Sequence, residues 1–171
     1  MDEDHYVDVV DEQDRVIGKD LRSMKPVKGF ITRVVGILIR DSCGKYIICK
    51  RSPNKKTEPN KYDFTACGMV EFGESYEHAA RRELLEETKL MCELKQLCKK
   101  YFQFEEQGRI RKCMLAVFEG ISDQDPVLCD ELVGYKKRSF DELQNEIKTH
   151  PELFTANFPC EIEFVKGLLH K

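Results

Sequence analysis

The chain has 171 residues, of which 41% are hydrophobic and 35% charged, as is typical of a single globular domain. Its net charge of −3 and pI near 5.9 give no general attraction to nucleic acid or to an acidic membrane surface. The acidic start lacks the apolar core of a signal peptide, and the longest apolar run, residues 34–39, is too short to span a bilayer. We therefore expect one cytoplasmic domain over residues 1–171, with neither a membrane nor a nucleic-acid partner.

The first half of the chain is predicted to form two hairpins, a loop and a helix. In residues 1–27, YVDVV and RVIGK flank the polar turn DEQD and predict an N-terminal β-hairpin, which packs either in cis or across a homodimer. Residues 30–40 are β-branched and apolar, DSCGK makes a turn, and residues 46–50 return as a strand. Residues 51–63 carry two prolines without periodicity, which indicates a polar loop before a short strand at 64–67. Residues 75–89 contain no glycine or proline and predict a helix.

The second half adds strands and two helices. Residues 94–104 and 109–119 are predicted to pair as strands joined at EEQG, and residues 131–139 form another strand. Ser139 and Glu142 form the capping box of a helix over 140–149, which Pro151 ends, and residues 161–169 form a last helix. Strands on both sides of one helix, with helices at the end, indicate an α/β/α sandwich around a mixed β-sheet.

The eight cysteines lie mostly inside apolar runs, and none forms a CxxC pair. Reduced, buried thiols are therefore expected rather than a disulfide framework. The four histidines are scattered, and no Cys/His spacing matches a structural zinc site.

Three glutamates of the predicted helix over 75–89 share one face. Glu83, Glu86 and Glu87 stand at i, i+3 and i+4, so their carboxylates fall within an arc of about 100°. Such like charges repel each other, and a hard cation with oxygen ligands, such as Mg²⁺ or Mn²⁺, would remove that repulsion. For the glutamates alone, solvated i,i+4 pairs such as Arg82 with Glu86 are the more ordinary explanation.

The residues around these glutamates decide between the two explanations. The segment 68–90 resembles the Nudix box: Gly, five residues, Glu, seven residues, Arg-Glu, an aliphatic, any residue, Glu-Glu, any residue, Gly, an aliphatic. The matching positions are Gly68, Glu74, Arg82, Glu83, Leu84, Glu86, Glu87 and Leu90. The resemblance implies a Nudix-like α/β/α sandwich with a mixed β-sheet, here preceded by an N-terminal hairpin extension over 1–27.

The resemblance also implies a metal site and the residues that support it. The candidate ligands of Mg²⁺ or Mn²⁺ are Glu83, Glu86, Glu87 and Cys67, with Glu87 first among them. The residues that support the site are Gly68, Glu74 and Arg82. Lys89 replaces the second glycine of the pattern, which would end the helix in a left-handed conformation that other residues adopt at a cost of about 1 kcal/mol. We expect Lys89 to alter the exit turn without removing a ligand.

The loop before the box suggests a branch of the family. KRSPNKKTEPNKYDFTACG, with HPELFTANF near the end, resembles the branch that holds isopentenyl diphosphate isomerase and its hydrolase-like relatives, over about residues 6–158. The resemblance implies that Arg51 and Lys55 bind the diphosphate, as a bidentate fork and a point charge would. Cys67 also falls where the isomerases carry their catalytic cysteine, but Met69 stands where they carry a metal-binding histidine.

The favoured reaction is metal-assisted hydrolysis of a diphosphate linkage in a nucleoside diphosphate derivative or related small organic diphosphate. Glu86 and Glu87 of the box are catalytic candidates. The proton acceptor is Glu86 or an acidic residue of a later loop. The loop candidates are Glu105, Glu106, Asp130 and Glu131, of which Glu131 is preferred because it precedes a strand pattern like the one that supplies an accessory carboxylate in the family. An isomerase and a non-catalytic nucleotide-binding module are the alternatives.

Overall fold

Seven strands form one mixed sheet in the computed structural model, which describes residues 4–106 and 108–169. The central strand β3 (Thr32–Arg40) is parallel to β8 (Arg109–Ile121) and antiparallel to β4 (Tyr46–Arg51) and β6 (Ala66–Met69). The other strands are β5 (Tyr62–Asp63), β7 (Leu94–Glu106) and β9 (Leu132–Arg138). On one side of β3, β4 pairs with residues 39–40 and β6 with residues 34–37, so the sheet divides between β4 and β6.

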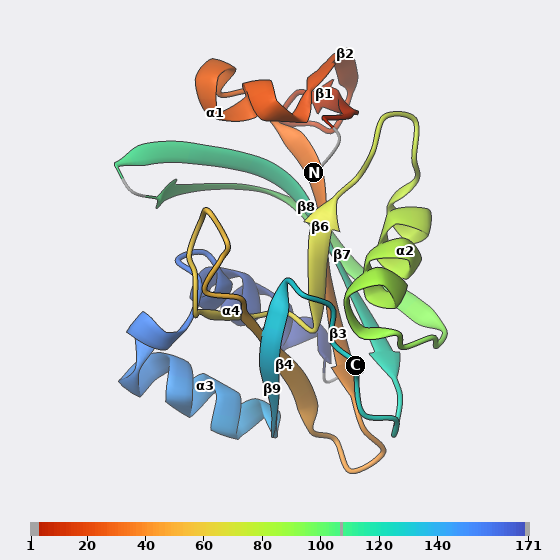
Figure 1. Cartoon of the computed structure of the whole chain (residues 1–171), viewed down its shortest axis with the longest axis vertical. Helices are drawn as coiled ribbons and strands as arrows, with labels where there is room; N and C mark the ends of the chain where they lie inside the picture. Colours follow the sequence, from red (N-terminus) through yellow and green to blue (C-terminus); the bar gives the residue numbers. More distant parts are fainter. Residues whose placement is uncertain (1–3, 107, 170–171) are drawn as a thin grey trace.

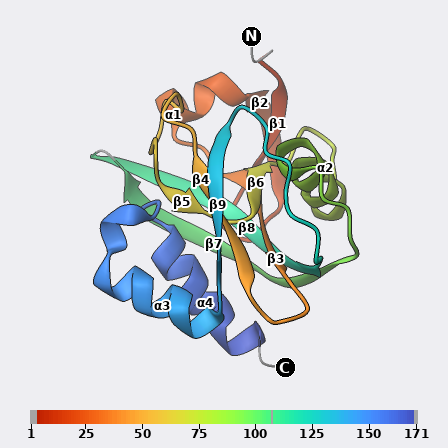
Figure 2. The same ribbon diagram turned by 60° about the horizontal axis from the view of Figure 1, so that its bottom comes forward.

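Helices cover both faces of this sheet (Figures 1 and 2). Helix α2 (Tyr76–Thr88) packs on one face, and α3 (Phe140–Thr149) and α4 (Phe158–Leu169) pack on the other. The alternation of β3 divides the core accordingly, because Val35 and Ile37 contact the α2 cluster while Leu38 contacts the α3/α4 cluster. This arrangement confirms the predicted α/β/α sandwich with a mixed sheet.

Local signals fixed several boundaries. The capping box is present, since the Glu142 N–H donates to Ser139 Oγ at 3.2 Å and the Ser139 N–H donates to Glu142 Oε2 at 2.7 Å. Pro151 ends α3 as predicted and opens a short 3₁₀ turn, η2 (Pro151–Leu153). Helix α4 begins at Phe158, three residues before the predicted start, because Phe158 is fully buried against Phe64 with ring centroids 5.2 Å apart.

One predicted strand was misplaced. The segment 64–67 is not a single strand, because Thr65 bonds to two different strands. Its N–H donates to the Ile37 carbonyl of β3, and its hydroxyl donates to the Ile47 carbonyl of β4. Regular pairing therefore stops after β5 and resumes at β6, two residues later than predicted.

The N-terminal hairpin of β1 (Tyr6–Val10) and β2 (Val16–Leu21) packs in cis. Its turn residue Asp14 accepts hydrogen bonds from Arg33 Nε at 2.7 Å and from the Tyr76 hydroxyl at 3.0 Å. Two short turns that the sequence did not predict, η1 (Arg22–Met24) and α1 (Lys25–Lys28), connect it to β3. Within the described ranges, no helix has the length and apolar character needed to cross a membrane.

Candidate functional site

Helix α2 presents the predicted carboxylates beside strand β6. Ser75 caps its N-terminus by accepting a hydrogen bond from the His78 N–H at 3.1 Å. Lys89 caps its C-terminus with φ 58° and ψ 10°, and the Lys89 N–H donates to the Leu85 carbonyl at 3.1 Å. The expected change in the exit turn is therefore wrong: Lys89 itself adopts the left-handed conformation that a glycine would take, and it bears the steric strain.

Arg82 connects the loop before α2 to the helix. Its Nε and Nη2 donate to the two oxygens of Glu74 at 3.0 and 2.9 Å, its Nη1 donates to Glu83 Oε1 at 2.8 Å, and its Nη2 also reaches the Met69 carbonyl at 3.0 Å. Burial alone would raise the pKa of Glu74, but these hydrogen bonds, with others from the Glu71 N–H and His78, lower it to about 2. The network holds the Glu83 carboxylate in place.

Gly68 leaves the room that Glu83 occupies. A Cβ at position 68 would lie 2.0 Å from both Cδ and Oε1 of Glu83, so a larger residue there would have to displace this carboxylate. Burial raises the pKa of Glu83, and the charge of Glu86 adds to that effect while Arg82 opposes it.

Glu87 lies at the open edge of β6. Its Oε2 accepts a hydrogen bond from the Cys67 N–H at 3.0 Å. Burial raises the pKa of Glu87 to about 8; the Cys67 N–H opposes the rise and the neighbouring Glu83 carboxylate adds to it. The Glu86 side chain, by contrast, is 60% exposed, and its Oε2 accepts a long hydrogen bond of 3.5 Å from Arg82 Nη1.

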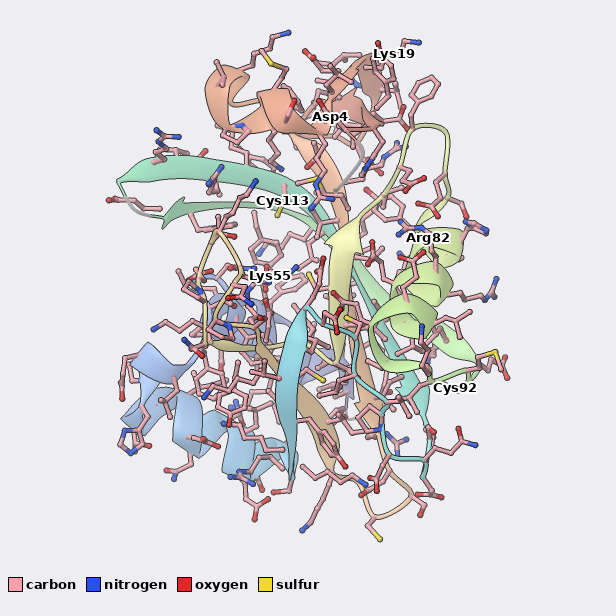
Figure 3. All side chains as sticks on the ribbon, in the orientation of Figure 1. Asp4, Lys19, Lys55, Arg82, Cys92 and Cys113 are labelled. Carbon is pink, nitrogen blue, oxygen red and sulfur yellow. The ribbon has the colours of Figure 1, made fainter. Side chains whose placement is uncertain are left out.

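Two loops bring Lys55 and Glu131 to the same place. The Lys55 ammonium contacts Glu131 Oε2, and the Ser52 N–H joins the loops by donating to the Glu131 carbonyl at 2.8 Å. Both charges act on Glu87, Lys55 lowering its pKa and Glu131 raising it. Figure 3 shows Lys55 and Arg82 on opposite sides of β6, so the site has a cationic side chain on each side of this strand.

Arg51 is turned toward its own loop. Its Nε donates to the Glu58 carbonyl at 3.2 Å and its Nη2 to the Thr57 carbonyl at 3.0 Å, while Nη1 lies 3.8 Å from Asp63. Arg51 therefore braces the loop that carries Lys55. Of the two predicted cations, Lys55 is the one whose ammonium lies near the box carboxylates.

The Cys67 thiol packs in the other layer. Ala66 belongs to the cluster under α2, whereas Cys67 packs against the cluster under α3 and α4. Burial raises the pKa of the Cys67 thiol, as do the charges of Asp63, Glu161 and Glu87. The group of Cys67 that contacts the box is therefore its backbone N–H, which donates to Glu87, and not its thiol.

The four acidic candidates of the later loops lie in different surroundings. Glu105 is the last but one residue of the long strand β7, whose C-terminal end lies away from α2 in Figure 1. The side chain of Glu106 lies outside the described part of the chain. Asp130 is exposed beside Glu131. Of the candidates whose side chains the structure describes, only Glu131 contacts Lys55.

Sequence reasoning missed several buried carboxylates, among them Asp63 and Glu161. Asp63 lies at the end of the loop and accepts a hydrogen bond from the Phe64 N–H at 2.9 Å. Glu161 lies on the inward face of α4, in the same stripe as Phe158, Ile162 and Val165. The sequence signal that could have revealed Glu161 is its place three residues after Phe158, within the apolar stripe of the helix.

The arrangement of Glu83 and Glu87 fits a hard divalent cation. Each carboxylate receives one hydrogen bond from the described residues, Glu83 from Arg82 and Glu87 from the Cys67 N–H, so further lone pairs remain for a metal. Within the described ranges, no three His, Cys, Asp or Glu side chains already form a metal-binding group. Mg²⁺ commonly takes one or two carboxylates and completes its shell with waters and substrate phosphate oxygens, so the donor set is compatible with it.

Comparison with known proteins gives a consistent result. The family model described as NUDIX domain matches residues 31–158. A "Nudix hydrolase" of Deinococcus radiodurans is 42% identical over 84 residues, a match that spans about half the length of each chain, 49% of both. An "Isopentenyl-diphosphate Delta-isomerase" of Pectobacterium atrosepticum is 29% identical over 88% of this chain and 85% of its own. The crystal structure of DR0079 from Deinococcus radiodurans superimposes with a TM-score of 0.78 at 27% identity, covering 93% of this chain and 98% of that one.

Proposed function

Because the chain belongs to the Nudix family, we propose that it is a hydrolase that depends on Mg²⁺ or Mn²⁺ and cleaves a diphosphate linkage in a small organic diphosphate, such as a nucleoside diphosphate derivative. The observation that carries the proposal is the placement of Glu83 and Glu87 with lone pairs to spare, next to the cation Lys55. Carboxylates for a metal and a lysine for phosphate oxygens are the groups that diphosphate cleavage requires.

Glu83, Glu86 and Glu87 would hold the metal. Arg82 and Glu74 orient Glu83, while the Cys67 N–H orients Glu87, so two carboxylates are fixed before any ligand arrives. A bound divalent ion supplies charge neutralisation at the phosphate oxygens and lowers the pKa of a nucleophilic water.

Lys55 and Glu131 have complementary roles in this proposal. In the described structure each neutralises the other. When Lys55 binds a phosphate oxygen, the Glu131 carboxylate loses its partner and becomes available to accept a proton from the attacking water. Glu86, which is exposed on α2, is the other proton acceptor compatible with the site.

The geometry supports hydrolysis over isomerisation. Proton transfer at an allylic carbon would use Cys67, which is partly buried and packs in the other layer with a raised thiol pKa, and Met69 offers no nitrogen ligand for a metal. The likeness to the Pectobacterium isomerase nevertheless makes isopentenyl diphosphate a necessary member of any substrate panel.

The experiment is a panel assay of phosphate and product release with Mg²⁺ or Mn²⁺. The substrates are nucleoside diphosphates, nucleoside triphosphates, nucleotide sugars and isopentenyl diphosphate. We expect Glu87→Gln to lower kcat/KM by roughly 100- to 1000-fold, since it removes a charged group from the reacting centre. Glu77→Gln, which changes an exposed glutamate of the same helix, should leave it unchanged. No hydrolysis by the wild type, with isomerised or merely bound ligand instead, would refute the proposal.

A further inference from the structure

A small cavity between helix α1 and the start of strand β8 is lined by a cluster of cations. Its volume of about 20 Å³ is the space of one water-sized group. Pro26 and Ile110, which are exposed, belong to its lining, so the cavity lies at the surface of the protein. No described residue that lines it is acidic, whereas four are basic: Lys25, Arg109, Arg111 and Lys112.

The overall charge balance of the chain does not account for this cluster. The chain has 31 acidic and 28 basic residues, and Lys28 of the same helix has an ordinary partner, since its ammonium lies 2.6 Å from Asp20 Oδ2. The side chains of Arg109 and Lys112, by contrast, form no ion pair with a described residue. Cations that are placed together without carboxylates repel one another, so a bound anion would stabilise the arrangement.

The Lys25 ammonium bonds to two other elements. It donates to Thr32 Oγ1 and, at 3.0 Å, to the Lys112 carbonyl, so it connects α1 to β3 and β8. Both acceptors are neutral oxygens. Burial and the charges of Arg111 and Arg22 lower the pKa of Lys25 to about 8. An ammonium group has three N–H donors, so one remains for a ligand in the cavity that Lys25 lines.

A solvated hairpin end explains only part of the cluster. Exposed basic residues commonly face water alone, and this accounts for Arg109 taken by itself. It does not account for Lys25, which is half-buried and donates to neutral oxygens. A tie between elements uses two of its N–H groups, and an uncharged donor would serve as a tie without the cost of burying a charge.

The cavity shares no residue with the candidate metal site. Figure 1 shows α1 and the end of the β7–β8 hairpin at the left of the molecule and α2 at the right. None of the described residues that line the cavity belongs to the segment 68–90 or to the loop that carries Lys55. A ligand bound in the cavity is therefore held by a separate set of side chains.

We propose that this cavity is a binding site for a phosphate group, with one oxygen inside it against Lys25 and the other oxygens at its mouth against Arg109 and Lys112. Phosphate oxygens accept charge-assisted hydrogen bonds from lysine and arginine, and the negative charge of the group offsets the repulsion among the cations. The volume admits one oxygen and not a whole phosphate, so the rest of the ligand faces solvent. The same chemistry occurs in inorganic phosphate and in the headgroup of phosphatidic acid. The inference does not depend on the proposed hydrolysis.

The first measurement is NMR of the backbone amides during titration with inorganic phosphate, at constant ionic strength and without divalent metal. We expect saturable shifts at residues 25–30 and 109–112 of the wild type. Arg109 is exposed, so its variants should fold; Arg109→Ala should weaken the Kd by roughly 10-fold, as the loss of one hydrogen bond to a charged group does, and Arg109→Glu should abolish binding. Lys95→Ala removes an exposed cation at the other end of the β7–β8 hairpin and should behave as wild type. Lys55→Ala should keep the same shifts, because Lys55 does not line the cavity.

The second measurement is co-sedimentation with vesicles of phosphatidylcholine, with and without added phosphatidic acid. Binding to the acidic vesicles that Arg109→Glu removes would identify a lipid headgroup as the source of the phosphate. Saturable binding of inorganic phosphate without vesicle binding would identify a free phosphate. Absence of saturable shifts at residues 25–30 and 109–112 of the wild type, or shifts there that persist in Arg109→Glu, would overturn the inference. Neither result bears on the hydrolase, which is tested with Glu87→Gln.

Discussion

Replacing Gly68 with alanine should disable the candidate site while leaving the fold intact. The new Cβ would lie 2.0 Å from Glu83 Cδ, where ordinary contacts begin at 3.4 Å, so the carboxyl group must retreat by about 1.4 Å. Because the clashing atoms are the end of a flexible side chain and not backbone, Glu83 can move without unfolding its surroundings.

The size of the effect follows from that displacement. A catalytic group that is misplaced by about 1 Å typically costs about 100-fold in rate, which corresponds to about 2.7 kcal/mol of transition-state stabilisation. We therefore expect kcat/KM for diphosphate hydrolysis to fall by about 100-fold and the affinity for Mn²⁺ to weaken. The free energy of unfolding should change by less than about 1 kcal/mol, since alanine also restricts the unfolded chain.

The assays are phosphate release, Mn²⁺ binding followed by electron paramagnetic resonance, and urea unfolding. Gly18→Ala is the matched control, because a Cβ at that position has nothing within 4 Å. Wild-type hydrolysis and Mn²⁺ affinity in Gly68→Ala would refute the reasoning that Gly68 makes room for a metal-binding carboxylate. A large loss of stability would show that the clash is borne by the backbone.

Three further predictions concern stability. Lys89→Gly should raise the free energy of unfolding by about 0.5–1 kcal/mol and Tm by about 2 °C in calorimetry, because Lys89 has φ 58°; an unchanged or lower Tm would contradict this. Asp14→Ala should destabilise the protein by about 3 kcal/mol in urea unfolding, since it removes the nearer of the two carboxylates that pair with the partly buried Arg33 and leaves only Asp8 at 3.3 Å; a loss under 1 kcal/mol would argue against docking of the hairpin through this pair. Burial and the charge of Asp63 raise the pKa of Glu161 from 4.5 to about 8. Between pH 4.5 and pH 8 the native state therefore binds more protons than the unfolded state, and the free energy of unfolding falls as the pH rises through this range. The stability gain of Glu161→Gln should therefore grow between pH 5 and pH 8, by on the order of 1–3 kcal/mol in denaturant titrations, and a constant difference would show that the pKa is not raised.

Much of the fold was readable because its signals are local. The helix over 76–88 follows from its composition and the absence of glycine and proline, and the capping box at Ser139 specifies the start of α3. The strands β3, β4, β7, β8 and β9 were recognised from β-branched and apolar runs. The division of the sheet between β4 and β6 was not readable, since strand pairing depends on partners distant in the chain.

For the candidate site, the sequence by itself determined the acidic face of α2, because a helix with 3.6 residues per turn places Glu83, Glu86 and Glu87 together whatever surrounds it. Only the tertiary structure decided which neighbours meet that face. It paired Lys55 with Glu131, which is 76 residues away, turned Arg51 toward its own loop, and buried Glu161 beside Asn157. These contacts depend on how loops and layers close over one another, and that closure is set by the packing of the whole core and not by any local pattern of residues.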